Sequence, residues 1–82
     1  MSIEDIFQTM RELVSDHFEL DADEITMDSD FEDDLGADSV DVVELIMSVE
    51  DTFEVGETPE EVVTTLKTVG DVVNYIASKV AD

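Results

Sequence analysis

Residues 38–53 read DSVDVVELIMSVEDTF and form the most clearly patterned segment of this 82-residue chain. Apolar side chains recur there at intervals of three and four residues, the spacing of one face of an α-helix. The residues at this core spacing are Val42, Leu45, Ile46, Val49 and Phe53. Asp38 is expected to be the N-cap, because a short oxygen-bearing side chain accepts hydrogen bonds from the free N–H groups of the first turn. The segment therefore predicts a core helix over residues 39–53.

The same segment carries a second apolar stripe on a different side. This stripe consists of Val40, Val43 and Met47, at positions i, i+3 and i+7. Acidic side chains flank it, namely Asp41, Glu44, Glu50 and Asp51. One interpretation is ordinary core, since a small bundle can bury a broad helix face. The other is an exposed docking stripe for partners that present an apolar groove surrounded by Lys and Arg.

On the N-terminal side, a helix of about four turns is predicted from the 3.6-residue period of apolar residues. These residues are Ile3, Ile6, Phe7, Met10, Leu13, Val14 and Phe18. Ser2 and Asp5 provide a capping pair for its start. Residues 19–37 show no sustained period and are predicted to form a long ordered loop that Gly36 closes.

On the C-terminal side, two further helices are predicted. Thr58 is expected to cap a short helix that has Pro59 in its first position and runs through Leu66. Thr68 and Asp71 are expected to cap the last helix, whose inner stripe is Val69, Val72, Val73, Ile76 and Val80. The predicted fold class is all-α: a four-helix bundle with three longer helices, one short helix and a long first loop, in a single domain of residues 1–82.

The charge of the chain restricts its partners. The sequence has 24 acidic and three basic residues, for a formal net charge of −21, and it contains no cysteine. Such a charge repels nucleic acid and anionic lipid, so we expect no nucleic-acid partner and no stable membrane association. It favours basic protein patches, with an attraction that salt weakens. The N-terminal residues match neither a signal peptide nor a membrane span, so a cytoplasmic location is expected.

Residues 30–45 read DFEDDLGADSVDVVEL and resemble the attachment region of bacterial acyl carrier proteins. In that family Leu-Gly-Ala-Asp-Ser precedes an apolar residue and an acidic helix. The resemblance continues through Met47, Phe53 and the sequence TVGD at 68–71, so it covers most of the chain. The acidic residues after Ser39 are most similar to those of the free-standing carriers of bacterial type II fatty-acid synthesis.

This resemblance implies a function. Ser39 matches the serine that receives 4'-phosphopantetheine from coenzyme A, and Asp38 is the acidic residue that precedes it. The chain would then hold growing acyl chains as thioesters on that arm and present them to fatty-acid synthesis enzymes, without being an enzyme itself. The implied partners are a phosphopantetheinyl transferase (holo-acyl-carrier-protein synthase) and fatty-acid synthase enzymes with basic docking patches. The chain itself is expected to be a monomer. The positions that match the family's recognition helix are Asp38, Asp41, Glu44, Met47, Glu50 and Asp51. With Val40 and Val43 of the apolar stripe, the expected partner-binding residues are Val40, Asp41, Val43, Glu44, Met47, Glu50 and Asp51.

Other functions remain open on the sequence. A bare Asp-Ser pair is most often only a helix cap. A catalytic serine is disfavoured, because the single histidine, His17, is expected on another helix, and a nucleophile needs a base within hydrogen-bond reach. A carrier for polyketide or D-alanyl transfer would use the same serine, whereas an unmodified acidic interaction module would need no arm.

No dedicated metal site is predicted. Asp28, Asp30 and Glu32 alternate as in an EF-hand loop, but the sixth position is Asp33 and the twelfth is Ser39, where that loop requires glycine and glutamate.

One departure from the carrier family lies at residues 54–59, which are one residue longer than usual. Glu57 and Thr58 stand there where an apolar residue is common, and Val55 is the candidate replacement in the wall of an acyl pocket.

Overall fold

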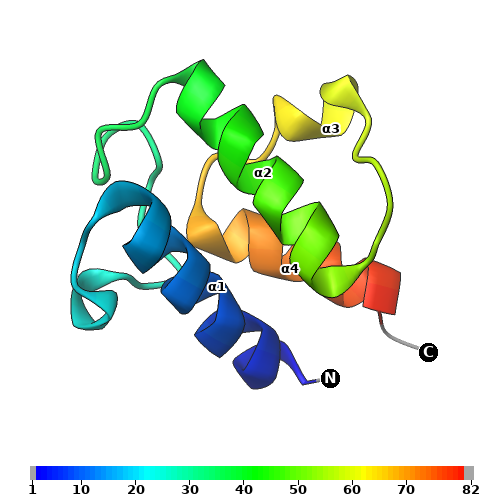
Figure 1. The fold of residues 1–82 in the computed structure, drawn as a ribbon, viewed down its shortest axis with the longest axis horizontal. Helices are drawn as coiled ribbons and strands as arrows, with labels where there is room; N and C mark the ends of the chain where they lie inside the picture. The colour runs from blue at the N-terminus through cyan, green and yellow to red at the C-terminus, as the bar shows by residue number, and fades with distance from the viewer. Residues whose placement is uncertain (1, 81–82) are drawn as a thin grey trace.

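The computed structural model describes residues 2–80 and is all-helical there apart from one isolated bridge. Three long helices form the bundle: α1 (Ile3–Phe18), α2 (Ser39–Phe53) and α4 (Val69–Val80). A single-turn helix, α3 (Glu60–Val63), follows α2 and precedes α4 along the chain (Figure 1). The predicted fold class, with three longer helices, one short helix and a long first loop, is confirmed.

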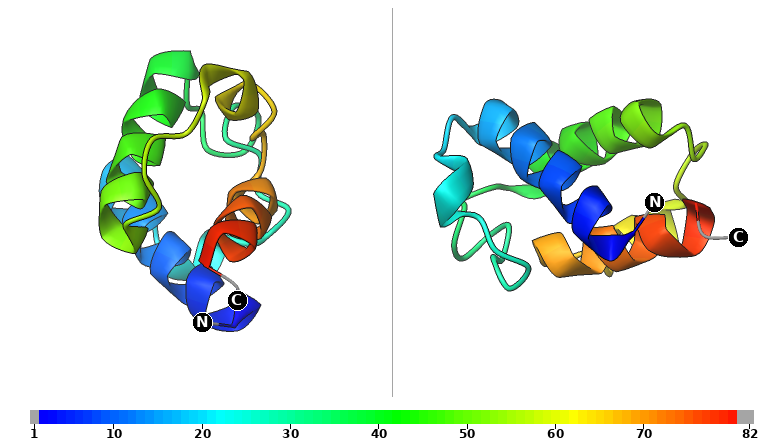
Figure 2. Two further views of the ribbon diagram at one scale, coloured as in Figure 1. Left: turned by 90° about the vertical axis from the view of Figure 1, so that its right-hand side faces the viewer. Right: turned by 90° about the horizontal axis from the view of Figure 1, so that it is seen from below.

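Helix α1 packs against both α2 and α4. Figure 2 shows the first turn of α1 and the last turn of α4 at the same end of the bundle. The buried core is built from the apolar faces predicted by the periodicity: Ile6, Met10 and Val14 of α1, Val42, Leu45, Ile46 and Val49 of α2, and Val69, Val72, Val73 and Ile76 of α4. Burial of these faces supplies most of the stability, because short helices in water are marginal without it.

Helix starts are set by reciprocal caps. Ser2 and Asp5 form a capping box at α1, as predicted. At α4 the Asp71 N–H donates to the Thr68 hydroxyl, while the Thr68 N–H donates to the Asp71 carboxylate, both at 3.1 Å. Such pairs satisfy backbone donors that the helix itself leaves free. Helices α1 and α2 both end on a left-handed glutamate, Glu19 and Glu54.

The long first loop is ordered by side chains and by backbone pairing. It contains a short 3-10 helix, η1 (Ala22–Glu24), which the sequence did not indicate. Ile25 and Phe31 bury their side chains in the core. The loop also pairs with the segment before α4, where the Phe31 N–H donates to the Lys67 carbonyl at 3.0 Å. This pairing fixes the path of the chain into α2.

The prediction for the short helix is partly wrong. Helix α3 ends at Val63 instead of continuing through Leu66, and its N-cap position is Pro59, without a side-chain cap hydrogen bond. Thr58 is buried, and its hydroxyl has no hydrogen-bond partner within residues 2–80. Its backbone N–H instead donates to the carboxylate of Glu50. Thr58 therefore does not cap α3.

Candidate functional site

The start of α2 presents Ser39 to solvent. Asp38 is the N-cap, and its carboxylate accepts the Asp41 N–H at 3.0 Å, while the Asp41 carboxylate accepts the Asp38 N–H at 3.2 Å. These two residues complete the capping box, so the Ser39 hydroxyl is not used by the cap. Ser39 is the first residue of the helix and is exposed. A hydroxyl in this position is accessible to another protein and lies at the positive end of the helix dipole.

The second stripe of α2 is a surface feature. The exposed fractions of Val40, Val43 and Met47 are 61%, 45% and 61%, whereas Leu45 on the opposite face is fully buried. Of the two interpretations of this stripe, ordinary core is therefore excluded by the structure. The stripe is therefore available for contact with other molecules.

The four flanking carboxylates differ in their surroundings. Glu44 and Asp51 are exposed, whereas Asp41 and Glu50 are half-buried. Asp41 is engaged in the cap, and Glu50 accepts the N–H of Thr58, so both also have a structural task. In the described part of the chain none of the four pairs with a lysine or arginine. The field around the stripe is therefore strongly negative.

A groove of about 680 Å³ runs beside Ser39, between the start of α2 and the α3 region. Its apolar wall includes Val40, Val43, Phe31, Val63 and Leu66. No local sequence pattern connects these residues, because Phe31 and Leu66 lie in loops and only the tertiary fold places them against α2. Val55 is half-buried against the core, and the groove wall next to Ser39 is formed by Val63 and Leu66.

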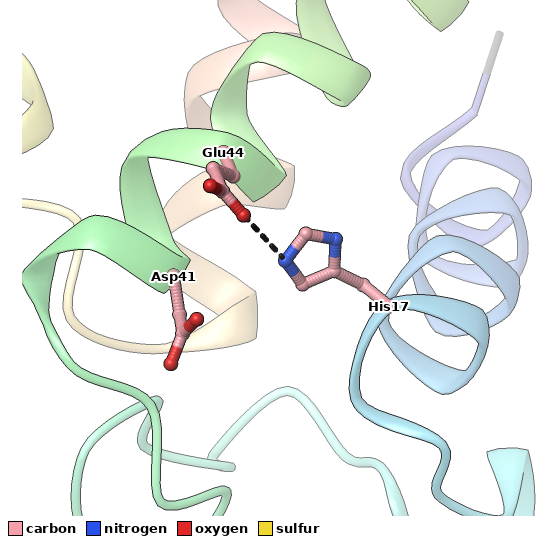
Figure 3. A group of neighbouring side chains, drawn as sticks. All are labelled: His17, Asp41 and Glu44. Carbon is pink, nitrogen blue, oxygen red and sulfur yellow. Dashed lines mark ion pairs between the residues drawn. The ribbon is translucent and has the colours of Figure 1, made fainter.

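His17 lies close to the start of α2, although the two are far apart in the sequence. It is in the last turn of α1, and its Nε2 atom is 4.0 Å from a carboxylate oxygen of Glu44. Figure 3 shows the imidazole facing Glu44, with Asp41 one turn earlier on α2. The crossing of α1 and α2 creates this proximity, which no local pattern reveals.

Comparison with known proteins gives a consistent result. A family described as "Phosphopantetheine attachment site" matches residues 8–76. The chain is 52% identical to an acyl carrier protein of Clostridium perfringens over 71 residues, which cover 87% of this chain and 92% of that one. It is 47% identical to an acyl carrier protein of Lactobacillus acidophilus over 78 residues, covering 95% and 96% of the two chains.

A solved structure is also similar. It is described as an acyl carrier protein of high thermal stability from Enterococcus faecalis, and it matches with a TM-score of 0.78 and 37% identity over 96% of this chain and 99% of that one. The chain therefore belongs to the acyl carrier proteins, a family of small helical domains with a phosphopantetheine attachment site.

Family membership implies a covalently bound 4'-phosphopantetheine, a carrier role, and contact with synthase enzymes and a phosphopantetheinyl transferase. The residues at the start of α2 fit such a group. Ser39 offers a free hydroxyl at an exposed helix start, and the groove gives an arm or its cargo an apolar surface to lie against. In residues 2–80, no helix combines the length and the apolar character needed to cross a bilayer.

Proposed function

We propose that this chain carries acyl groups on a 4'-phosphopantetheine arm attached at Ser39 and presents them to fatty-acid synthesis enzymes. The observation that carries the proposal is the position of Ser39: it is exposed, it is excluded from the cap that Asp38 and Asp41 form, and it borders the apolar groove. The arm supplies the thiol that holds an acyl group, which a chain without cysteine cannot provide.

In the bond-forming step of attachment, this chain contributes the Ser39 hydroxyl as the reacting group. Its oxygen bonds to the phosphorus next to the pantetheine of coenzyme A, the bond from that phosphorus to the nucleotide breaks, and the hydroxyl proton is lost. The phosphodiester that results carries a negative charge. The free N–H groups and dipole of α2 favour an anion there, but Asp38 and Asp41 oppose it. The balance favours an arm that is held by its covalent bond and otherwise extends into solvent.

The groove beside Ser39 is our candidate for partial shelter of the acyl chain. Its wall carries valine, leucine and phenylalanine side chains, and burial of methylene groups against them is worth about 0.8 kcal/mol each. Charged residues, among them Asp30, Glu32 and Glu60, also line the groove and interrupt its apolar surface. A cargo that is held weakly in such a groove stays available to the enzymes that must reach it.

Docking is proposed to use the exposed stripe and its acidic border. The proposed contact residues are Val40, Asp41, Val43, Glu44, Met47, Glu50 and Asp51. A partner with an apolar groove and a ring of Lys and Arg would cover the stripe and meet the carboxylates. The net charge of −21 would speed the encounter, and added salt would slow it. We also propose that the chain forms a single domain and acts in the cytoplasm. We expect it to be a monomer, because the stripe must be free to meet one enzyme after another.

Intact-mass measurement tests the attachment. The chain is incubated with coenzyme A and a phosphopantetheinyl transferase, and we expect a gain of one phosphopantetheine, located by peptide mapping on the peptide that contains Ser39. Ser39→Ala should gain nothing while keeping the circular dichroism spectrum of a helical bundle. Ser48→Ala, at an exposed serine of the same helix, is the matched control and should be modified normally.

The opposite results would remove the proposal. A wild-type chain that gains no mass, or a Ser39→Ala chain that still does, would favour an unmodified acidic interaction module. The cargo found on the arm in the native host then distinguishes the pathways. Fatty acyl groups support the proposed role, whereas D-alanyl or polyketide groups would assign the same serine to a different carrier function.

A further inference from the structure

Three side chains from two helices converge at the crossing of α1 and α2. His17 comes from the last turn of α1, and Asp41 and Glu44 lie one turn apart near the start of α2 (Figure 3). One nitrogen of the imidazole and one oxygen of each carboxylate all lie within 4.8 Å of one another. A nitrogen and two anionic oxygens at such distances form a typical set of ligands for a transition-metal ion.

The contacts inside this cluster leave room for an ion. His17 Nε2 and the Glu44 carboxylate are 4.0 Å apart, which is too long for a hydrogen bond. Ligands that share Zn²⁺ at about 2.0–2.2 Å each lie roughly 3.0–3.5 Å apart, so the gap is close to that of a metal site. The Glu44 side chain is 59% exposed and can close the difference by changing its rotamer. Asp41 uses Oδ2 in the cap, which leaves Oδ1 for an ion.

The electrostatic environment favours a cation. In the described part of the chain neither Asp41 nor Glu44 has a lysine or arginine partner. Arg11, the basic residue of α1, is directed to the Ala22 carbonyl and to Asp23 instead. The His17 side chain is only 24% exposed, so its ring is already restricted in its motion. The entropy lost when an ion fixes these ligands is correspondingly smaller.

We propose that His17, Asp41 and Glu44 bind a divalent transition-metal ion of the Zn²⁺ class, with water in the remaining coordination positions. The imidazole nitrogen distinguishes this site from clusters of carboxylates alone, which suit Mg²⁺ and Ca²⁺. This site is separate from the EF-hand-like series at residues 28–39, which lacks the glycine and the glutamate of a calcium-binding loop. The sequence patterns alone predict no dedicated metal site, so this proposal departs from that prediction.

Bound metal has two structural consequences. It links the end of α1 to the start of α2, and it therefore stabilises the folded state by its preference for that state. It also occupies two carboxylates of the acidic border of the exposed stripe. The proposal itself depends only on the ligands and holds whether or not Ser39 carries an arm.

The single histidine of the chain makes the site directly observable. The imidazole signals in a ¹H–¹⁵N NMR spectrum belong to His17 alone, so no assignment by mutation is needed. We expect Zn²⁺ to shift or broaden these signals at stoichiometric amounts, and Mg²⁺ at the same concentration to leave them in place. The full chain is used unmodified, and again with the arm attached and its thiol alkylated, because a free thiol would bind zinc by itself.

Calorimetric titration with Zn²⁺ measures the contribution of each ligand. His17→Gln and Glu44→Gln should each weaken binding by at least about tenfold, since even supporting groups around a metal contribute about 10- to 100-fold. Glu12→Gln, an exposed charge change on α1, is the control and should bind as the wild type does. Melting temperature should rise with Zn²⁺ in the wild type and in Glu12→Gln more than in His17→Gln.

Several results would overturn the proposal. One is a Zn²⁺ affinity that is equal in the wild type and in His17→Gln, with unchanged imidazole signals, which would show diffuse binding to the acidic surface only. Another is an equal NMR response to Zn²⁺ and Mg²⁺. If His17→Gln fails to fold, Glu44→Gln and the imidazole spectrum of the wild type still decide the question.

Discussion

The backbone N–H of Gly70, in the first turn of α4, donates a hydrogen bond of 2.8 Å to the carbonyl oxygen of Met27 in the first loop. A Cβ atom at position 70 would lie only 2.8 Å from that same oxygen. The close approach of two backbone segments therefore requires glycine here. This contact attaches the long loop to α4 and, through the loop, fixes where α2 begins.

Replacement of Gly70 by alanine is expected to destabilise the fold. Overpacking against a backbone atom costs about 1–3 kcal/mol, which exceeds the gain of about 1 kcal/mol in helix propensity. We expect a net loss of about 1 kcal/mol, or about 4–8 °C in melting temperature for a domain of this size. Asn74→Ala, at an exposed position of α4, is the control and should be neutral or stabilising. An unchanged melting temperature in Gly70→Ala would mean that the loop yields without cost.

Thr58→Val is expected to stabilise the protein. The Thr58 hydroxyl is buried without a hydrogen-bond partner within residues 2–80, and an unsatisfied buried polar group costs about 1–3 kcal/mol. Valine has nearly the same shape and keeps the backbone N–H that donates to Glu50. We expect the free energy of unfolding, measured by urea titration, to rise by about 1 kcal/mol with an unchanged m-value. Thr58→Ser retains the hydroxyl and should show no gain. A loss of stability in Thr58→Val would indicate that a water molecule satisfies the hydroxyl.

Arg11 is expected to be replaceable by lysine only at a cost. Its Nε and Nη2 atoms donate to the Ala22 carbonyl at 3.0 and 2.8 Å, and its guanidinium lies 5.4 Å from the ring centre of Phe7. Lysine keeps the charge but loses the planar fork, so Arg11→Lys should lose about 1–2 kcal/mol of stability. Hydrogen exchange should rise in residues 19–25, which this contact holds. Asp23→Asn should have little effect, because the Asp23 side chain is fully exposed.

Met47→Ala separates docking from folding. Met47 is 61% exposed, so its truncation should change the free energy of unfolding by less than about 0.5 kcal/mol. If the stripe is the docking surface, kcat/KM for arm transfer by a phosphopantetheinyl transferase, or affinity for a synthase enzyme, should fall by about 5- to 10-fold. Ile3→Ala removes an apolar side chain that is 45% exposed on α1 and should leave both unchanged. Equal effects of the two variants would argue against a specific stripe.

Local patterns in the sequence predict α1, α2 and α4, and for α2 they also predict the bounds, residues 39–53. Ser2, Asp38 and Thr68 were recognised as caps because a cap is an interaction between residues three positions apart, which the sequence displays directly. The same logic failed at Thr58. Thr58 is buried, Pro59 takes the N-cap position of α3, and no side chain caps that helix.

The position of Ser39 could also be predicted, because one N-cap residue and the helical period place it in the first turn of α2. The surroundings of Ser39 could not. The groove joins α2 to Phe31 and Leu66, and the His17 cluster joins α2 to the end of α1. These neighbours are far apart in the sequence, so no spacing rule connects them.

The long helices, most of their caps, the negative charge and the exposed start of α2 can all be read from local sequence, because hydrogen bonds and periodicity within one helix depend on residues three or four positions apart. Which stripe of α2 is buried depends instead on how the helices pack. Val42, Leu45 and Val49 are buried, whereas Val40, Val43 and Met47 stay in solvent. One helix carries both stripes, and only the positions of α1 and α4 determine which of them is covered.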